Sequence, residues 1–158
     1  MNVFKKLLSR RYLFLIAIIL AVGFGIHYYF VDPLNIALDK PTHTLKDYVK
    51  PDKILVVSFW ASWCGHCKNE VGVLTQLKEH HPEIDIIGLQ VDYDKPGPIF
   101  LNANYPSINA SENGAQIMQL YGNFTAGVPF IIMLKNKKSK TFLGETDLST
   151  LEQNIASI

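Results

Sequence analysis

The chain has 158 residues, of which 48% are hydrophobic and 18% are charged, and its formal net charge is +1. This length suits one domain with an additional segment. A net charge near zero gives no reason to expect a nucleic-acid partner, because binding to a phosphate backbone requires an excess of basic residues. Two cysteines are too few for a disulfide-stapled scaffold, so an ordinary hydrophobic core must stabilise the domain.

The N-terminus joins a basic segment to a long apolar one. Four lysines and arginines lie within residues 1–11, and an apolar run extends from Tyr12 to Val31. As a helix, these twenty residues would span about 30 Å, the thickness of the hydrocarbon layer of a membrane. The positive-inside rule keeps the basic end in the cytoplasm. We therefore predict a cytoplasmic segment 1–11 and a single transmembrane signal anchor 12–31 in the lipid bilayer.

A cleaved signal peptide is the alternative reading of the same run. No Ala-x-Ala-like cleavage site ends it, and the bulky Tyr28-Tyr29-Phe30 resembles an interfacial aromatic belt. These features favour an uncleaved anchor. Residues 32–42 are predicted to be a linker, because Pro33 and Pro41 block helix formation at its ends. The globular domain is then residues 43–158.

The first half of that domain predicts a strand–helix–strand unit. The run Ile54 to Trp60 is apolar and β-branched, as in a buried strand. Residues 68–80 have helical spacing of their apolar side chains, and Ile84 to Val91 is a second strand-like run. Such a unit predicts two parallel strands joined by a right-handed crossover. The preceding segment, His43 to Tyr48, is expected to form a short turn or edge element.

The second half predicts two helices and a hairpin. A short helix is expected around Ile99 to Ala103 and a longer one over Asn113 to Tyr121. Strands Phe130 to Leu134 and Thr141 to Leu143 are expected to pair across a lysine-rich loop, Asn136 to Lys140. A last helix follows, for which Asp147 or Ser149 is the candidate N-cap.

Both cysteines lie between the first strand and its helix, in the sequence Trp63-Cys64-Gly65-His66-Cys67. A thiolate at Cys64 would face the unpaired amides and the positive end of the helix, which lower the pKa of a thiol. We expect Cys64 at the exposed start of the helix and Cys67 shielded one turn further in. This spacing is typical of a reversible dithiol.

Two other roles are conceivable for a pair of cysteines, a structural disulfide and a metal site. A purely structural disulfide is poorly motivated, because a two-residue loop constrains the unfolded chain little. A zinc site usually needs four ligands, and the chain has no second cysteine pair. Copper binding, with His66, His80 or His81 as neighbours, is the remaining non-enzymatic alternative. No metal or cofactor is expected.

The motif from Trp63 to Cys67, followed by Gly127-Val128-Pro129, resembles thioredoxin-fold oxidoreductases. More closely, the chain from about Thr44 onward is similar to the TlpA-like, membrane-anchored bacterial thiol-disulfide oxidoreductases. The resemblance implies an α/β thioredoxin fold with a central mixed sheet flanked by helices. It also implies that the segment from Tyr105 to Gly122 is a TlpA-like insertion.

The resemblance also assigns roles at the site. Cys64 would be the nucleophile and Cys67 the resolving cysteine of a redox disulfide. Trp63 would flank the site, Val128 would offer its backbone to the bound substrate, and Pro129 would follow a cis peptide bond. The alternative for Pro129 is a proline that merely opens an edge strand.

Two further residues are candidates for moving or stabilising charge. His66 would stabilise the Cys64 thiolate, or else be an exposed residue without a role. Thioredoxin has a buried aspartate where this chain has Ser58, so its proton acceptor cannot be transferred directly. Glu70 matches an acidic position of TlpA-like proteins and is the candidate acceptor. An exposed helix carboxylate is its alternative reading.

The predicted function is a membrane-tethered periplasmic thiol-disulfide oxidoreductase of the bacterial inner membrane. Its substrates would be protein thiols or disulfides, and a membrane thiol-redox partner would supply or accept electrons. Gly65-His66 also occurs in protein disulfide isomerase, and a valine before the cis proline occurs in DsbA, both of which favour an oxidase or isomerase. The TlpA-like scaffold favours a reductase, such as those of cytochrome c biogenesis, and we give reduction a slight preference. A chaperone or copper carrier is the alternative from another class.

Overall fold

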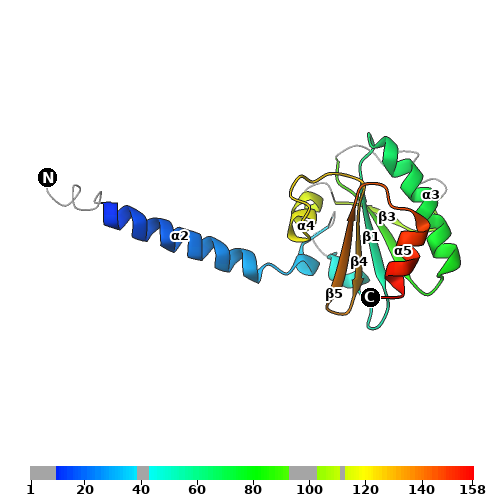
Figure 1. The fold of residues 1–158 in the computed structure, drawn as a ribbon, viewed down its shortest axis with the longest axis horizontal. Coiled ribbons are helices and arrows are strands. Elements are labelled where there is room, and N and C mark those ends of the chain that lie inside the picture. Colours follow the sequence, from blue (N-terminus) through cyan, green and yellow to red (C-terminus); the bar gives the residue numbers. More distant parts are fainter. Residues whose placement is uncertain (1–9, 39–42, 93–102, 111–112) are drawn as a thin grey trace. The chain divides into compact units, whose positions relative to one another are not determined.

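The computed structural model describes residues 10–38, 43–92, 103–110 and 113–158, and it divides the chain into two compact units, 1–32 and 33–158. The first unit contains helix α2, Arg10–Phe30 (Figure 1). Apolar side chains of α2 are exposed, Phe14 to 70% and Ile19 to 68%. Within the described part of the chain, no helix meets the length and apolarity required to cross a membrane. The transmembrane anchor stays a prediction.

The second unit is built on a five-stranded sheet in the order β3-β2-β1-β4-β5. Strand β1 pairs in parallel with β2 and antiparallel with β4, while β3 adds in parallel to β2 and β5 antiparallel to β4. The mixed sheet and the parallel β1–β2 pair are therefore confirmed. The strands are Leu55–Trp60 (β1), Asp85–Gln90 (β2), Ser107–Asn109 (β3), Phe130–Lys135 (β4) and Lys138–Leu143 (β5).

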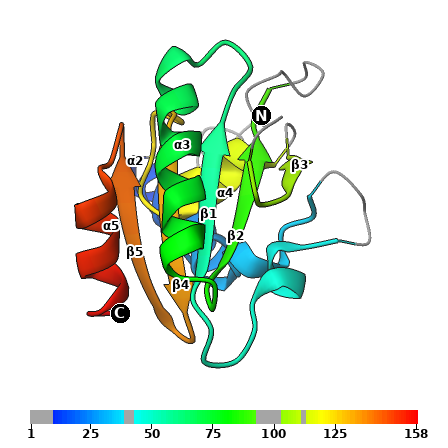
Figure 2. The same cartoon turned by 90° about the vertical axis from the view of Figure 1, so that its right-hand side faces the viewer.

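Helices cover both faces of this sheet (Figure 2). Helix α3, Gly65–His80, and helix α5, Leu148–Ile155, lie on one face, and α4, Gly114–Leu120, lies on the other. Alternate residues of β1 point to opposite faces, so Val56 packs in the cluster of α3 and α5 whereas Val57 packs in the cluster of α4. All of β1 is buried. This double burial explains why its sequence is apolar on both faces rather than alternating, with the buried Ser58 as its polar exception.

Residues 33–38, predicted as part of the linker, have local structure and contacts with the core. Pro33–Asn35 forms a 3-10 helix, η1, and Ala37 forms a β-bridge with Thr44, just before the 3-10 helix η2, Leu45–Tyr48. Leu38 is 5% exposed and belongs to the core cluster on the α4 face. Pro33 opens a 3-10 helix instead of an α-helix, and the apolar side chain of Leu38 still packs onto the core.

Two details of the second half also differ from expectation. Strand β5 begins at Lys138, so the predicted lysine-rich loop shrinks to a turn of Asn136 and Lys137, in which Asn136 has a φ of 54°. Exposed lysines are compatible with β5 because it is an edge strand. The three-residue strand β3 was not predicted, since it is short and directly follows Pro106. The short helix expected around Ile99 to Ala103 lies, except for its last residue, outside the described residues.

Candidate active site

A disulfide joins Cys64 and Cys67 at the start of α3, with the two Cα atoms 5.4 Å apart. Cys64 is the N-cap of the helix, and its sulfur accepts a hydrogen bond of 3.2 Å from the backbone N–H of Cys67. An unpaired helix amide and the helix dipole therefore act directly on this sulfur. The disulfide and its place at the helix N-terminus agree with the sequence analysis.

Cys64 is more buried than expected. It is 4% exposed and Cys67 is 1% exposed, because Trp60, Ala61, Val91 and Val128 pack around the pair. The two sulfurs thus differ in position along the helix rather than in exposure. Trp60 and Ala61 pack against one side of the disulfide. A partner protein must therefore approach the disulfide from the side of the helix N-terminus.

Asp92 organises the turn that leads into Cys64, and the sequence analysis did not single it out. Its carboxylate accepts hydrogen bonds from the backbone N–H of Ser62 at 2.9 Å, from the Ser62 hydroxyl, and from Gln90 Nε2 at 2.8 Å. Burial alone would raise the pKa of Asp92, but these donors outweigh it and lower the pKa below its usual value. The sequence does contain a sign of this contact. Asp92 follows β2 just as Cys64 follows β1, and the carboxyl ends of parallel strands lie at the same edge of a sheet.

The peptide bond between Val128 and Pro129 is cis, as predicted. The Val128 side chain packs against the cluster that contains both cysteines. The loop before it is fixed by the buried Asn123, whose side-chain amide donates to Gly127 O at 2.8 Å and accepts from Gly127 N at 3.2 Å. The structure therefore brings Val128 and Pro129 to the disulfide, while their part in substrate binding stays a prediction.

The two tryptophans occupy different environments. Trp63, directly before Cys64, is 72% exposed and flanks the disulfide. Trp60 is buried beneath it, and its Nε1 donates to Ser107 Oγ on β3 at 2.9 Å. The unpredicted strand β3 thus supports the floor of the site, whereas Trp63 offers an apolar surface to an incoming partner.

Glu70 is buried, so its reading as an exposed helix carboxylate is wrong. It lies one turn after Cys67 on α3 and is 2% exposed. Its Oε2 accepts a 3.1 Å hydrogen bond from Ser58 Oγ, and Oε1 has no hydrogen-bond partner among the described residues. Burial raises the pKa of Glu70, the Ser58 bond lowers it in part and the charge of Glu145 raises it, and the net result is a pKa of about 8. Burial, together with the Glu70 charge, also raises the pKa of Tyr105.

His66 faces away from the expected interaction. Its Nδ1 lies 2.9 Å from Oε1 of Glu145, and its side chain is 78% exposed. Asn69, further along the same helix, donates to the same carboxylate oxygen at 2.9 Å. Glu145 was not singled out from the sequence, because no periodicity or motif places residues after β5 against α3. Stabilisation of Cys64 by His66 stays a prediction.

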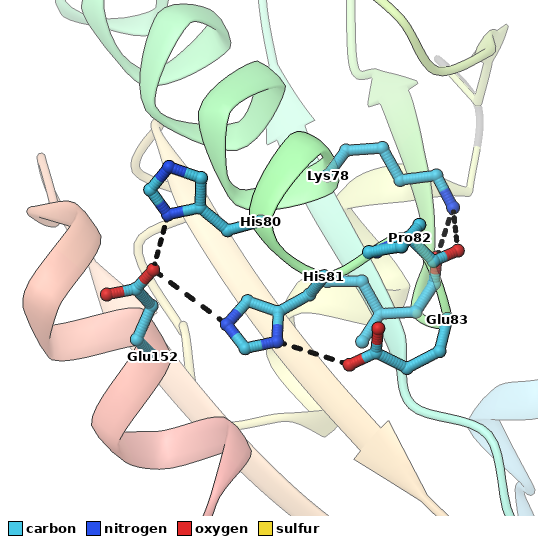
Figure 3. A network of polar contacts seen from close by, with 7 residues as sticks. Lys78, His80, His81, Pro82, Glu83 and Glu152 are labelled. Atoms are coloured by element: carbon cyan, nitrogen blue, oxygen red, sulfur yellow. Dashed lines mark hydrogen bonds and ion pairs between the residues drawn. The ribbon is translucent and has the colours of Figure 1, made fainter.

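His80 and His81, the other two candidate copper neighbours, lie at the opposite end of α3 (Figure 3). His80 Nδ1 is 2.8 Å and His81 Nε2 is 3.8 Å from Glu152 Oε1 on α5. His81 Nδ1 is also 3.1 Å from Glu83 Oε1. Among the described residues, no group of three or more His, Cys, Asp or Glu side chains is arranged to hold a metal ion.

The fold and this disulfide define a thioredoxin-like protein with a redox-active pair of cysteines. The family model for thioredoxin matches residues 38–127, more than half of the chain. The chain belongs to the thioredoxin family and is a thiol-disulfide oxidoreductase.

Individual relatives support this assignment, and the share of the chain that aligns with them differs. A protein disulfide-isomerase candidate of Schizosaccharomyces pombe is 32% identical over 81 residues, which are 49% of this chain and 16% of that protein. The chain therefore spans only a small part of that relative. The thiol-disulfide oxidoreductase ResA of Bacillus thuringiensis is 24% identical over 98% of each chain.

Solved structures show the same fold. A DsbF homologue from Corynebacterium diphtheriae has a TM-score of 0.60 at 29% identity, covering 76% of this chain and 80% of that one. A thioredoxin-related protein from Neisseria meningitidis has a TM-score of 0.63 at 23% identity, covering 76% and 93%.

Proposed function

We propose that the protein is a tethered thiol-disulfide oxidoreductase that acts on proteins outside the bacterial inner membrane, with reduction as its favoured direction. Cys64 is the nucleophile and Cys67 the resolving cysteine. Protein thiols and disulfides are the substrates, apocytochrome c among them, and a membrane thiol-redox partner restores the dithiol. This assignment joins the TlpA-like resemblance to the kinship with ResA.

One observation carries the proposed mechanism: a buried carboxyl group lies next to the resolving cysteine. Glu70 and Cys67 are three residues apart on α3, a spacing that places two side chains on the same face of a helix, and both are buried. The pKa of Glu70 is about 8, so this buried carboxyl group can take up or release a proton near neutral pH. A group with that property suits proton exchange with a neighbouring thiol.

The reduction of a substrate proceeds in two exchanges. The Cys64 thiolate attacks one sulfur of the substrate disulfide, a mixed disulfide forms, and the first substrate thiolate leaves. In the fraction of molecules in which Glu70 is ionised, which grows as the pH approaches 8, Cys67 transfers its proton to Glu70 and attacks Cys64. The second substrate thiolate leaves, the substrate has gained two electrons, and the Cys64–Cys67 disulfide is formed. Oxidation of a substrate is the same sequence in reverse.

Substrate docking is proposed at the segment before Pro129. Val128 lies beside the disulfide, and the exposed Trp63 flanks it from the start of α3. A substrate strand that pairs with the Val128 backbone would present its sulfur to Cys64 while packing on Trp63. These two contacts use backbone atoms and an apolar side chain, so they suit many sequences and select for an extended segment.

The proposed tether is supported by the sequence of the first unit. Basic residues precede an apolar run of membrane length, and α2 exposes large apolar side chains such as Phe14. A test is carbonate extraction of membranes from a bacterium that expresses the full chain. Retention in the membrane and digestion of the domain by external protease would support the tether and the periplasmic location. Release into the supernatant would reject the tether.

The direction of exchange is tested by the reduction potential of residues 33–158, which form one compact unit. Equilibration with glutathione measures it against about −270 mV for thioredoxin and about −120 mV for DsbA. A value near the first supports a reductase. A value near the second rejects that direction and leaves an oxidase or isomerase.

The enzymatic class is tested separately from the direction. Cys67→Ser should accumulate a mixed disulfide with a substrate protein, because its resolving thiol is missing, and Cys64→Ser is the matched control that should trap none. A wild-type protein as inert as Cys64→Ser in insulin reduction would leave the chaperone or copper-carrier alternative.

A further inference from the structure

Glu145 links the cysteine helix to the loop that contains the cis proline. It follows Gly144, which has a φ of 87° and whose backbone N–H donates to Pro129 O at 2.9 Å. On its other side, Asp147 caps α5 by accepting from the Thr150 N–H at 2.9 Å. The backbone on both sides of Glu145 is thus held in place, and its side chain reaches to α3.

The Glu145 carboxylate meets two side chains in the first turns of α3. Its Oε1 is 2.9 Å from His66 Nδ1 and 2.9 Å from Asn69 Nδ2. The Asn69 bond and then the His66 bond lower the pKa of Glu145, so the group is ionised at neutral pH. An ionised carboxylate only accepts hydrogen bonds, and the proton between the two residues therefore belongs to His66 Nδ1.

Pairing with Glu145 changes what His66 can do for Cys64. An imidazole between the two cysteines would stabilise the Cys64 thiolate by turning its proton or positive charge toward the sulfur. In the structure the Nδ1–H points to Glu145 instead, and the carboxylate charge cancels that of a protonated ring. Whichever protonation state the ring has, the pair is more negative by one charge than His66 alone.

We propose that Glu145 is a positioning residue that holds His66 away from Cys64 and thereby makes the dithiol a stronger reductant than its Gly-His dipeptide would otherwise be. The inference rests on the proposed function in that Cys64 is the reacting thiol. Less stabilisation of the Cys64 thiolate disfavours the reduced form, so the dithiol gives up its two electrons more readily to a disulfide. The Gly65-His66 dipeptide favours an oxidising couple, whereas the TlpA-like scaffold favours a reducing one. Glu145 would shift the couple in the reducing direction despite this dipeptide.

Other charged groups near the pair are compatible with this role. Burial, with a smaller contribution from the charge of Glu145, raises the pKa of Glu70 to about 8, so Glu70 is largely neutral at pH 7. Lys68 is exposed on the same helix, and Asp147 is occupied as the cap of α5. The ionised group that contacts His66 is therefore Glu145.

The test measures the thiol-disulfide equilibrium constant of the full chain with glutathione, in detergent. Glu145→Ala removes the charge and frees the ring, and we expect about a threefold shift toward the dithiol. Glu152→Ala is the matched control, because it removes a glutamate that contacts His80 Nδ1 at 2.8 Å at the far end of the same helix. It should leave the equilibrium constant unchanged.

The same substitution in a His66→Ala protein distinguishes the positioning of His66 from a direct effect of the Glu145 charge on the disulfide. In His66→Ala protein, Glu145→Ala can only remove a charge, so its shift should fall below about twofold. Equal shifts in both backgrounds, no shift, or a shift toward the disulfide would each overturn the proposal. Far-ultraviolet circular dichroism confirms that each variant is folded.

The equilibrium constant does not depend on catalysis, so the two proposals fail separately. A wild-type chain that does not reduce insulin rejects the proposed function. An unchanged equilibrium constant in Glu145→Ala rejects the role of Glu145, even if insulin reduction is normal.

Discussion

The two ends of helix α3 have similar polar groups and different consequences. At each end a histidine Nδ1 lies within 3 Å of a glutamate from the region of α5. His66 is 2.9 Å from Glu145, and His80 is 2.8 Å from Glu152, the pair drawn in Figure 3. Only the N-terminal end also holds a disulfide. The same type of contact therefore has two roles. In our proposal His66–Glu145 adjusts the redox couple, whereas His80–Glu152 joins helices α3 and α5.

The helix dipole strengthens this contrast. Its positive end faces Cys64 and favours a thiolate there. Its negative end has Lys78, whose ammonium donates to the backbone carbonyls of Pro82 and Ile84, and the histidines that contact Glu152. A positive charge suits this end whether or not chemistry takes place. A His–Glu pair can therefore influence catalysis only where a reactive group, here the disulfide, lies close to it.

The largest effect that separates the two ends is the loss of Cys64. Cys64→Ser should abolish insulin reduction with dithiothreitol, because the substrate disulfide then has no thiolate to attack it. His80→Ala, at the other end of the helix, should reduce insulin at the wild-type rate. Turbidity of the insulin B chain measures both, and residual activity of Cys64→Ser above the uncatalysed rate would contradict the assigned nucleophile.

A second effect concerns stability and comes from Glu70, near the N-terminal end. Its pKa is about 8 in the folded protein against a usual value of 4.5, so between these pH values the folded state binds a proton that the unfolded state releases. The free energy of unfolding should therefore fall as the pH rises through this window, by on the order of 5 kcal/mol in total. Glu70→Gln should remove most of this slope.

Urea unfolding of residues 33–158 at about pH 5 and about pH 9 measures that difference. Glu79→Gln is the matched control, since Glu79 is exposed on the same helix. An equal slope in wild type and Glu70→Gln would show that Glu70 is not the group responsible.

A smaller effect is expected from Ser58, which donates to Glu70 at 3.1 Å. Ser58→Ala removes a hydrogen bond that favours the ionised carboxylate, so the pKa of Glu70 should rise above about 8. Carboxyl carbon chemical shifts in a pH titration report this value directly. The pH at which the resolving step reaches half its maximal rate should rise with it, and an unchanged titration would contradict the proposed coupling.

The smallest effect is expected at the C-terminal end. Glu152→Gln breaks the contacts with His80 and His81, which are partly exposed, and should cost at most about 1 kcal/mol of stability. Thermal unfolding of the wild type and the variant measures the loss. A loss of several kcal/mol would contradict the small contribution expected of a partly exposed contact.

The sequence by itself determined most of the helices and strands, though not β3, and it determined the reactive pair of cysteines. The continuous apolar runs gave β1 and β2 to within a residue or two, because strands buried on both faces need no polar alternation. The strand–cysteine–helix order placed Cys64 at the N-terminus of α3. The proline in Gly-Val-Pro predicted the cis bond before Pro129, through a resemblance rather than through local physics.

The tertiary structure decided which polar groups meet. Glu70 had two readings in the sequence, and only the packing of α3 on the sheet buries it beside Ser58. Glu145 is 79 residues from His66 in the chain, and Asp92 is 30 residues from Ser62. A hydrogen bond between such distant residues depends on how helices and strands pack together, and the local periodicity of a sequence contains no information on that distance.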